Sequence, residues 1–266
     1  MLSDKKSHTG ELDLSGLRFE YQWVAPAQSD RPTLVLLHEG LGCVAMWKDV
    51  PERLAAATAC GVLVYSRAGY GASSSVSLPR ATRYMHDEAL VTLPALIEAT
   101  GLTSFVLVGH SDGGSISIIY AGGAQAKGLQ GVVLLAPHVF NEAVCVASAR
   151  AARRAYQETS LRDALENYHG DQVDIAFYGW NDVWLSDEFW HWNIEEYLSR
   201  INVPVLVLQG REDEYGTTAQ IEAIRAGLPA DGEFDALLID KCGHSPQRDA
   251  PELVDQALAQ FIERLA

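Results

Sequence analysis

The stretch Phe105-Val106-Leu107-Val108-Gly109-His110-Ser111-Asp112-Gly113-Gly114 decides the fold of this chain. It begins as a continuous apolar run, which is typical of a strand buried on both faces, and a helical pattern follows it. Residues 109–113 match G-x-S-x-G, a turn whose glycines let the chain bend sharply and lift the serine hydroxyl above the sheet edge. Because a chain with 22 glycines can contain this pattern by chance, the strand–turn–helix context carries the prediction that Ser111 is a nucleophile.

The bulk composition indicates a globular protein with one large core. Of the 266 residues, 48% are hydrophobic and 21% are charged, so the chain can form one domain with an inserted subdomain. The formal net charge of −15 disfavours binding to nucleic acid or to anionic membranes. We find no signal peptide and no run long enough to span a membrane, so we expect a cytoplasmic protein. The cysteines lack C-x-x-C spacing, which argues against a zinc site or disulfides and fits a reducing compartment: Cys43, Cys60, Cys145 and Cys242.

Strand-like and helical stretches alternate on both sides of Ser111. Residues 11–24 alternate apolar and polar side chains, which predicts an antiparallel pair at a sheet edge. Buried strands are predicted at residues 33–37, 62–65, 131–136, 205–210 and 235–240. Helices are predicted from Asp49 to a stop at Gly61, over 82–100 with a kink or break at Pro94, over 219–226 and over 251–265. This alternation predicts an α/β fold with a mostly parallel sheet covered by helices on both faces.

The pattern changes between residues 140 and 201, where strand-like runs give way to helical patterns rich in tryptophan. We expect this segment to be a helical cap inserted after the sixth strand, between core segments 1–139 and 202–266. Tryptophans that lie close together in a segment with little sheet to cover can line an apolar pocket. Trp180 and Trp184 are therefore candidate substrate contacts.

Loops after two later strands supply partners for the serine. In parallel sheets, reactive groups collect at the carboxyl ends of the strands. A nucleophilic serine needs a base to take its proton, and the base needs an acid to fix its tautomer. His244 follows the last predicted strand, and three acids follow the strand before it: Glu212, Asp213 and Glu214. Spacing alone does not choose among these acids.

The order of serine, acid and histidine resembles the α/β-hydrolase family in its capped serine-hydrolase branch, and the resemblance covers essentially the whole chain. His38-x-Gly40, with Trp47 nine residues after the histidine, resembles the family's oxyanion loop. Ser66-Arg67-x-Gly69-x-Gly71-x-Ser73 resembles its D-R-x-G-x-G-x-S turn. Gly243-His244 followed by Pro251-Glu252 resembles its histidine loop. These motifs are specific for the fold and unspecific for the substrate.

The resemblance implies a role for each matched residue. Ser111 would be the nucleophile, His244 the general base and then acid, and Asp213 the carboxylate that orients it. The backbone N–H groups of Gly40 and Asp112 would form the oxyanion hole. No cofactor or metal motif occurs in the sequence, so we expect neither.

Two positions depart from the family pattern, and one of them, Glu39, bears on the substrate. Ser66 stands where an aspartate is common, and Glu39 stands where a second glycine is common. A carboxylate at Glu39 or Asp112 opposes the negative charge of an oxyanion unless it is paired or points away. Either both are hydrogen-bonding partners in the scaffold, or one receives a polar or cationic substrate group. His138 follows the sixth strand at the mouth of the core, where it would be either a structural histidine or a substrate contact.

The leading hypothesis is carboxylesterase-like hydrolysis of a small-molecule ester, through an acyl-enzyme in an apolar or aromatic pocket under a helical lid. A carbon–carbon bond hydrolase, an enol-lactonase and a thioesterase stay open, because all of them use the same triad. Residues 40–45 also match G-x-G-x-x-A, the pattern of an NADP-dependent oxidoreductase. That alternative is disfavoured, because two residues separate this pattern from the strand and no acid closes the next strand. A non-enzymatic receptor that has kept the triad is a further alternative.

Overall fold

The computed structural model describes residues 6–124 and 126–265, which form an eight-stranded sheet. Its strands are β1 (His8–Leu14), β2 (Leu17–Val24), β3 (Thr33–Leu37), β4 (Val62–Tyr65), β5 (Phe105–His110), β6 (Leu129–Leu135), β7 (Val205–Gly210) and β8 (Phe234–Ile239). They lie in the order β1-β2-β4-β3-β5-β6-β7-β8. β1, β2 and β4 pair antiparallel, and the other neighbours pair parallel. The predicted mostly parallel sheet with an antiparallel edge is confirmed.

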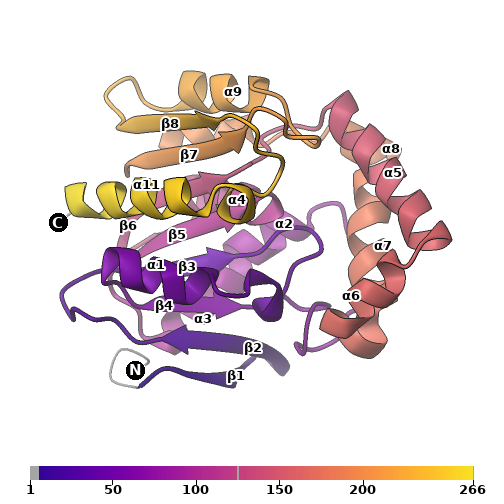
Figure 1. The fold of residues 1–266 in the computed structure, drawn as a ribbon, viewed down its shortest axis with the longest axis horizontal. Coiled ribbons are helices and arrows are strands. Elements are labelled where there is room, and N and C mark those ends of the chain that lie inside the picture. The colour runs from indigo at the N-terminus through magenta and orange to yellow at the C-terminus, as the bar shows by residue number, and fades with distance from the viewer. Residues whose placement is uncertain (1–5, 125, 266) are drawn as a thin grey trace.

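Helices cover both faces of the sheet and make two separate apolar cores. Helices α1 (Val50–Thr58) and α11 (Pro251–Arg264) pack on the face nearer the viewer in Figure 1. The other face is covered by α2 (Tyr84–Asp87), α3 (Leu93–Thr100), α4 (Asp112–Gly123) and α9 (Ala219–Gly227). In β5, Val106 and Val108 join the first core, whereas Phe105 and Leu107 join the second. This alternation explains the continuous apolar run, because successive side chains of a strand point to opposite faces.

The segment between β6 and β7 is helical, and we refer to it as the cap. It contains α5 (Ala143–Glu158), α6 (Leu161–His169), η4 (Gly170–Gln172), α7 (Val173–Trp184), α8 (Asp187–Trp190) and η5 (Glu195–Arg200). In Figure 1, α5 to α8 stand together to the right of the sheet. η5 instead packs on the core, since a Cβ atom added at Gly122 of α4 would lie 2.1 Å from the Tyr197 carbonyl oxygen.

One helical boundary differs from the predictions, one predicted break is present, and two short helices were not predicted. The first helix was expected to end at Gly61, but α1 ends at Thr58, where Ala59 takes the left-handed conformation at φ +60°. The helix expected over residues 82–100 is interrupted by η3 (Glu88–Thr92), a π-helical segment directly before α3. Pro94 explains this interruption, because its nitrogen cannot donate the helical hydrogen bond. Short helices η2 (Val44–Trp47) and α10 (Pro246–Asp249) lack the length that gives a periodic pattern.

Candidate active site

Ser111 lies on a sharp turn between β5 and α4. Its backbone has φ +52° and ψ −115°, a region that residues other than glycine rarely occupy and that costs about 1–3 kcal/mol. The glycines on either side make this turn possible. A Cβ atom at Gly109 would lie 2.1 Å from the Gly113 carbonyl oxygen, and one at Gly113 would lie 1.9 Å from the Leu37 carbonyl oxygen. The tight contact of strand, turn and helix therefore holds the serine in a strained conformation at the sheet edge.

His244 joins the serine to a carboxylate. Its Nε2 lies 2.9 Å from Ser111 Oγ, and its Nδ1 lies 2.7 Å from Asp213 Oδ1. Asp213 follows β7 and His244 follows β8, so all three side chains come from loops at the carboxyl ends of parallel strands. The fold thus brings together three residues that the sequence separates by up to 133 positions. This is the hydrogen-bonded order that a serine nucleophile, its base and an orienting acid require.

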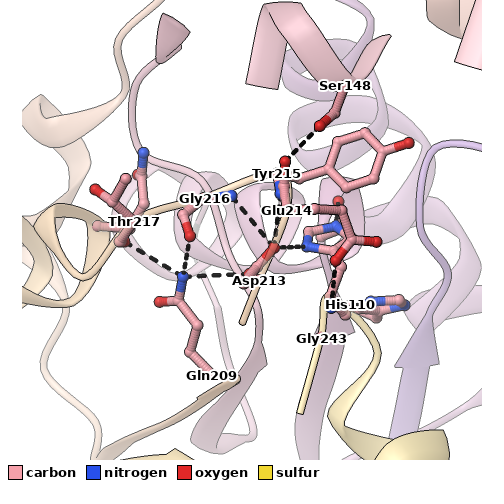
Figure 2. Close-up of polar contacts among 12 residues, drawn as sticks. His110, Ser148, Gln209, Asp213, Glu214, Tyr215, Gly216, Thr217 and Gly243 are labelled. Atoms are coloured by element: carbon pink, nitrogen blue, oxygen red, sulfur yellow. Dashed lines mark hydrogen bonds and ion pairs between the residues drawn. The ribbon is translucent and has the colours of Figure 1, made fainter. Parts of the chain in front are cut away.

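Asp213 is distinguished from its acidic neighbours by the donors around it. Its Oδ1 accepts hydrogen bonds from the N–H groups of Tyr215 (2.9 Å) and Gly216 (3.2 Å), and its Oδ2 accepts one from Gln209 Nε2 (3.2 Å), as Figure 2 shows. Burial alone would raise the pKa of Asp213, but the hydrogen bond and charge of His244 lower it below the usual value. Glu214 accepts a hydrogen bond from the His244 backbone N–H instead (3.2 Å). Asp213 is therefore held as a carboxylate against the imidazole.

A second carboxylate and imidazole hold the histidine loop from the other side. The His110 Nε2–H donates to the backbone carbonyl oxygen of His244 at 2.7 Å, and His110 Nδ1 faces Gln247 Nε2 at 3.1 Å and Glu39 Oε2 at 3.4 Å. Burial alone would lower the pKa of His110, but the hydrogen bond and charge of Glu39 raise the pKa above its usual value. Burial alone would raise the pKa of Glu39, but the hydrogen bond and charge of His110 lower that pKa to about 2. Glu39 is therefore ionised beside the site.

Arg67 fixes the loop that carries Gly40. Its guanidinium donates to the carbonyl oxygens of His38 (2.7 Å) and Glu39 (2.9 Å), and the His38 Nδ1–H donates to the same Glu39 oxygen (2.7 Å). In a trans peptide the N–H points opposite to the C=O, so Arg67 on one side directs the Gly40 N–H to the other. Among the described residues, neither the Gly40 N–H nor the Asp112 N–H has a hydrogen-bond acceptor. Both donors are thus free for a ligand oxygen.

The Asp112 side chain belongs to the scaffold. It is fully buried, its Oδ2 accepts a hydrogen bond from the Tyr84 hydroxyl at 2.5 Å, and Arg67 Nη2 lies 3.6 Å away. The Trp184 indole N–H donates to the same Tyr84 hydroxyl at 3.0 Å. The hypothesis that Asp112 receives a substrate group is therefore wrong for its carboxylate, which has no access to the cavity. For Glu39 the hypothesis stays open.

A cavity of about 280 Å³ lies over Ser111 and His244. All four predicted contacts line it: Glu39, His138, Trp180 and Trp184. Sequence reasoning missed its other apolar walls, which come from the loop after β3, from η2, α5 and α6, and from the loop after β7: Leu41, Met46, Cys145, Leu161, Leu165 and Tyr215. Side chains in loops and in α5 and α6 have no motif that relates them to the serine, so only the tertiary fold reveals them.

A second cavity of about 390 Å³ adjoins the first. The two share five lining residues: Glu39, Met46, His110, Ser245 and Arg248. His138 and Trp184 at one end of the first cavity are 1% and 2% exposed, whereas the Arg248 side chain at the shared border is 72% exposed. The combined space therefore runs from a buried end beside His138 to an open, charged end beside Arg248.

Within residues 6–124 and 126–265, no group of three or more His, Cys, Asp or Glu side chains is arranged to hold a metal ion. Across the same residues, every helix is too short or too polar to cross a bilayer.

Sequence comparison relates this geometry to known hydrolases. A family model described as the alpha/beta hydrolase family matches residues 34–257. A proline iminopeptidase from Lactobacillus helveticus is 30% identical over 125 residues, which are 47% of this chain and 42% of that protein. A (lyso)-N-acylphosphatidylethanolamine lipase from Homo sapiens is 32% identical over 98 residues, which are 37% of this chain and 28% of that protein. Both matches span less than half of the relative.

Solved structures share the fold over almost the entire chain. A putative lipase from Acinetobacter baumannii AYE superposes with a TM-score of 0.75 at 17% identity, covering 97% of this chain and 92% of its own. The esterase RhEst1 from Rhodococcus sp. ECU1013 superposes with a TM-score of 0.72 at 20% identity, covering 98% of this chain and 100% of its own. At these identities the likeness establishes the fold alone.

Proposed function

Since the chain belongs to the alpha/beta hydrolase family, we propose that it hydrolyses a small carboxylic ester through an acyl-enzyme on Ser111. One observation carries the proposal: the His244 imidazole lies between Ser111 Oγ and Asp213 Oδ1, within hydrogen-bond distance of both. A base in this position can take the serine proton as the oxygen attacks a carbonyl carbon.

Each step of the proposed reaction uses a group already in position. Ser111 Oγ attacks the ester carbonyl while His244 Nε2 takes its proton, and Asp213 stabilises the resulting imidazolium. The carbonyl oxygen becomes an oxyanion that the unpaired N–H groups of Gly40 and Asp112 can bind. His244 then protonates the leaving alcohol as the carbon–oxygen bond breaks. In the second half, His244 takes a proton from water, hydroxide attacks the acyl carbon, and the acid leaves as the proton returns to Ser111.

The two ends of the cavity suggest how the ester lies. The buried end, lined by Trp184 and Cys145, suits an apolar acyl group, because its burial removes apolar surface from water. The open end, where Glu39 and Arg248 border the second cavity, suits the leaving alcohol. The cavity volume favours a small-molecule substrate.

Four buried cysteines that form no disulfide support a reducing, cytoplasmic setting for the protein.

Burst kinetics test the proposal. We expect rapid mixing with p-nitrophenyl butyrate to release about one equivalent of p-nitrophenol per protein before steady turnover, with the butyryl group found on Ser111 after an acid quench. Ser111→Ala removes the burst, while Ser104→Ala, a change of an exposed serine before β5, keeps it. Turnover without an adduct on Ser111 would contradict the proposal.

A substrate panel separates the ester from its rivals. Thioesters, enol lactones and ring-cleavage dienoates can all use the same nucleophile. L-proline p-nitroanilide belongs in the panel because proline iminopeptidases are among the relatives. We expect the highest kcat/KM for oxygen esters, and a higher value for any other class would replace the ester as substrate.

A further inference from the structure

Hydrogen bonds of the backbone hold His138 in the active-site cavity. It lies in the loop after β6, where its carbonyl oxygen accepts a hydrogen bond from Ser115 Oγ at 2.6 Å. The next residue, Val139, donates its backbone N–H to Gln220 Oε1 at 2.8 Å. These bonds fix the backbone of the loop and leave the imidazole itself unattached.

The imidazole of His138 is buried without a hydrogen bond. The residue is 1% exposed, Nδ1 is shielded and unpaired, and no hydrogen bond joins either ring nitrogen to another described residue. An unpaired polar group in a protein interior is unfavourable, and in native structures it usually has a reason. Because the ring also lines the cavity over Ser111, a bound ligand is the partner that would satisfy it.

The position of the ring fixes which part of a substrate it can reach. Its centroid lies 5.6 Å from that of His244 and 5.2 Å from that of Trp184, at the buried end of the cavity. A carbonyl carbon attacked by Ser111 lies next to His244, so the His138 ring lies beside the first carbons of the acyl chain. Substituents on C2 or C3 are therefore the groups within its reach.

The surroundings of the ring fix the charge of that substituent. Burial and the nearby positive charge that His244 can carry lower the pKa of His138 to about 3, so the ring is neutral, with one donor and one acceptor nitrogen. Trp184 and Cys145 offer no opposite charge to a carboxylate or an ammonium group buried here, and Asp213 is already bonded to His244. An uncharged oxygen fits, because it exchanges hydrogen bonds with neutral imidazole without bringing a charge into the interior.

We propose that His138 selects esters whose acyl group carries an uncharged hydroxyl or oxo oxygen on C2 or C3. This inference rests on the proposed function and names the acyl class that the site prefers. His138 binds this oxygen with a ring nitrogen, while Trp184 and Cys145 enclose the rest of the acyl chain.

Matched esters test the role of His138. We compare kcat/KM for ethyl 3-hydroxybutanoate, ethyl 2-hydroxybutanoate and ethyl 3-oxobutanoate with that for ethyl butanoate, each divided by its alkaline hydrolysis rate. In the wild type we expect at least one oxygenated ester to be favoured about three- to tenfold, the effect of one neutral hydrogen bond. His138→Phe keeps an aromatic ring and should bring this ratio to about one. His138→Gln keeps a donor and an acceptor and should retain part of the preference.

Partial loss of folded protein does not change the ratio of the two kcat/KM values, because both esters are measured on the same preparation. Leu161→Val alters a cavity wall without a polar group and should leave the ratio unchanged. A wild-type ratio of one or less for every oxygenated ester, or a ratio that His138→Phe does not change, overturns the inference.

Failure of the proposed function gives a different result. A wild type that hydrolyses no ester and acquires no acyl group on Ser111 refutes the ester proposal. Calorimetry with neutral 3-hydroxybutanamide then tests His138 directly, with Ser111→Ala as the parent protein. If the double variant Ser111→Ala/His138→Phe binds the amide about three- to tenfold more weakly than Ser111→Ala, the result supports the His138 site. Equal affinity of the two proteins overturns it.

Discussion

Gly40 shows how closely the candidate oxyanion loop and the cap fit together at the level of single residues. A Cβ atom at Gly40 would lie 2.2 Å from Cδ1 and 2.4 Å from Nε1 of Trp180, which stands on α7. No side chain fits in this space unless the indole moves. The glycine is thus needed for the close approach of Trp180 to the loop whose free N–H the proposed reaction uses.

Gly40→Ala should therefore lower kcat/KM by about ten- to a hundredfold, because the added methyl displaces either the loop or the indole. The loss should be much smaller when Trp180→Ala is the parent protein, because the methyl group then has room. Steady-state kinetics of the two single variants and the double variant measure this coupling. Equal losses in both parent proteins would show that Trp180 is not the obstacle.

Asp213→Asn tests the orienting carboxylate. An asparagine there can offer an N–H to His244 Nδ1, which favours the tautomer with the proton on Nε2 and leaves no base for Ser111. We expect kcat to fall about 10³- to 10⁴-fold with KM little changed. Glu212→Gln, a change of the exposed acid beside it, should leave kcat unaltered. Comparable losses in the two variants would remove Asp213 from its proposed role.

At the level of elements, contacts among three loops keep the site together. The loop after β3 contributes Glu39, the turn after β5 follows His110, and the loop after β8 contributes the His244 carbonyl oxygen and Gln247. His244 and the acidic group Glu212 to Glu214 could be anticipated from the sequence because each follows a strand at the same sheet edge, whereas the choice of Asp213 among the three acids came from the family resemblance. The role of His110 could not, because its partners lie 71 or more positions away and no motif joins them.

The Glu39–His110 pair should make stability depend on pH. The lowered pKa of Glu39, about 2, stabilises the fold above its usual value of 4.5, and this contribution is lost as pH falls through 2. The raised pKa of His110 stabilises the fold below 6.5, and this contribution is lost as pH rises through the raised value. The contribution of the pair is therefore largest between about pH 4.5 and 6.5.

Glu39→Gln should lower the free energy of unfolding by about 1–2 kcal/mol at pH 5.5 and by less at pH 9. The expected effect is small because the Glu39 side chain is 27% exposed and partly screened by water. Urea unfolding at both pH values measures the difference. Glu11→Gln, which removes an exposed pair with Arg18, should have no measurable effect at either pH. A Glu39→Gln effect that is the same at pH 5.5 and 9 would contradict the ion pair.

At the level of the whole molecule, the cap is tied to the loops that form the site. His169 of α6 accepts a hydrogen bond from the Gly71 N–H at 3.0 Å and donates one to the Leu41 carbonyl oxygen at 2.9 Å. Trp184 of α7 donates to Tyr84 of the core. The sheet and its helices could be predicted because alternating burial leaves a periodic pattern. These cap contacts could not, because each joins single side chains from distant loops and helices.

Buried neutral histidines should weaken the protein in acid. Burial lowers the pKa values of three histidines: His38, His138 and His169. Below pH 6.5 these side chains bind protons in the unfolded chain but stay neutral in the folded chain. The free energy of unfolding therefore decreases as the pH is lowered. For His138, with a folded pKa of about 3, the loss between pH 8 and pH 5 is about 2 kcal/mol. His138→Phe should therefore lose about 2 kcal/mol less than the wild type over this range in urea unfolding. Identical pH dependence in both proteins would contradict a neutral, buried His138.

The most direct test of the account is covalent labelling by a fluorophosphonate, followed by peptide mass spectrometry. An activated serine beside a base attacks this reagent and keeps the phosphonyl group. We predict a single adduct on Ser111 in the wild type, none in Ser111→Ala, and much slower labelling in His244→Ala, whose serine has lost its base. A wild type without an adduct, or with one on another residue, would contradict the claim that Ser111 is the nucleophile.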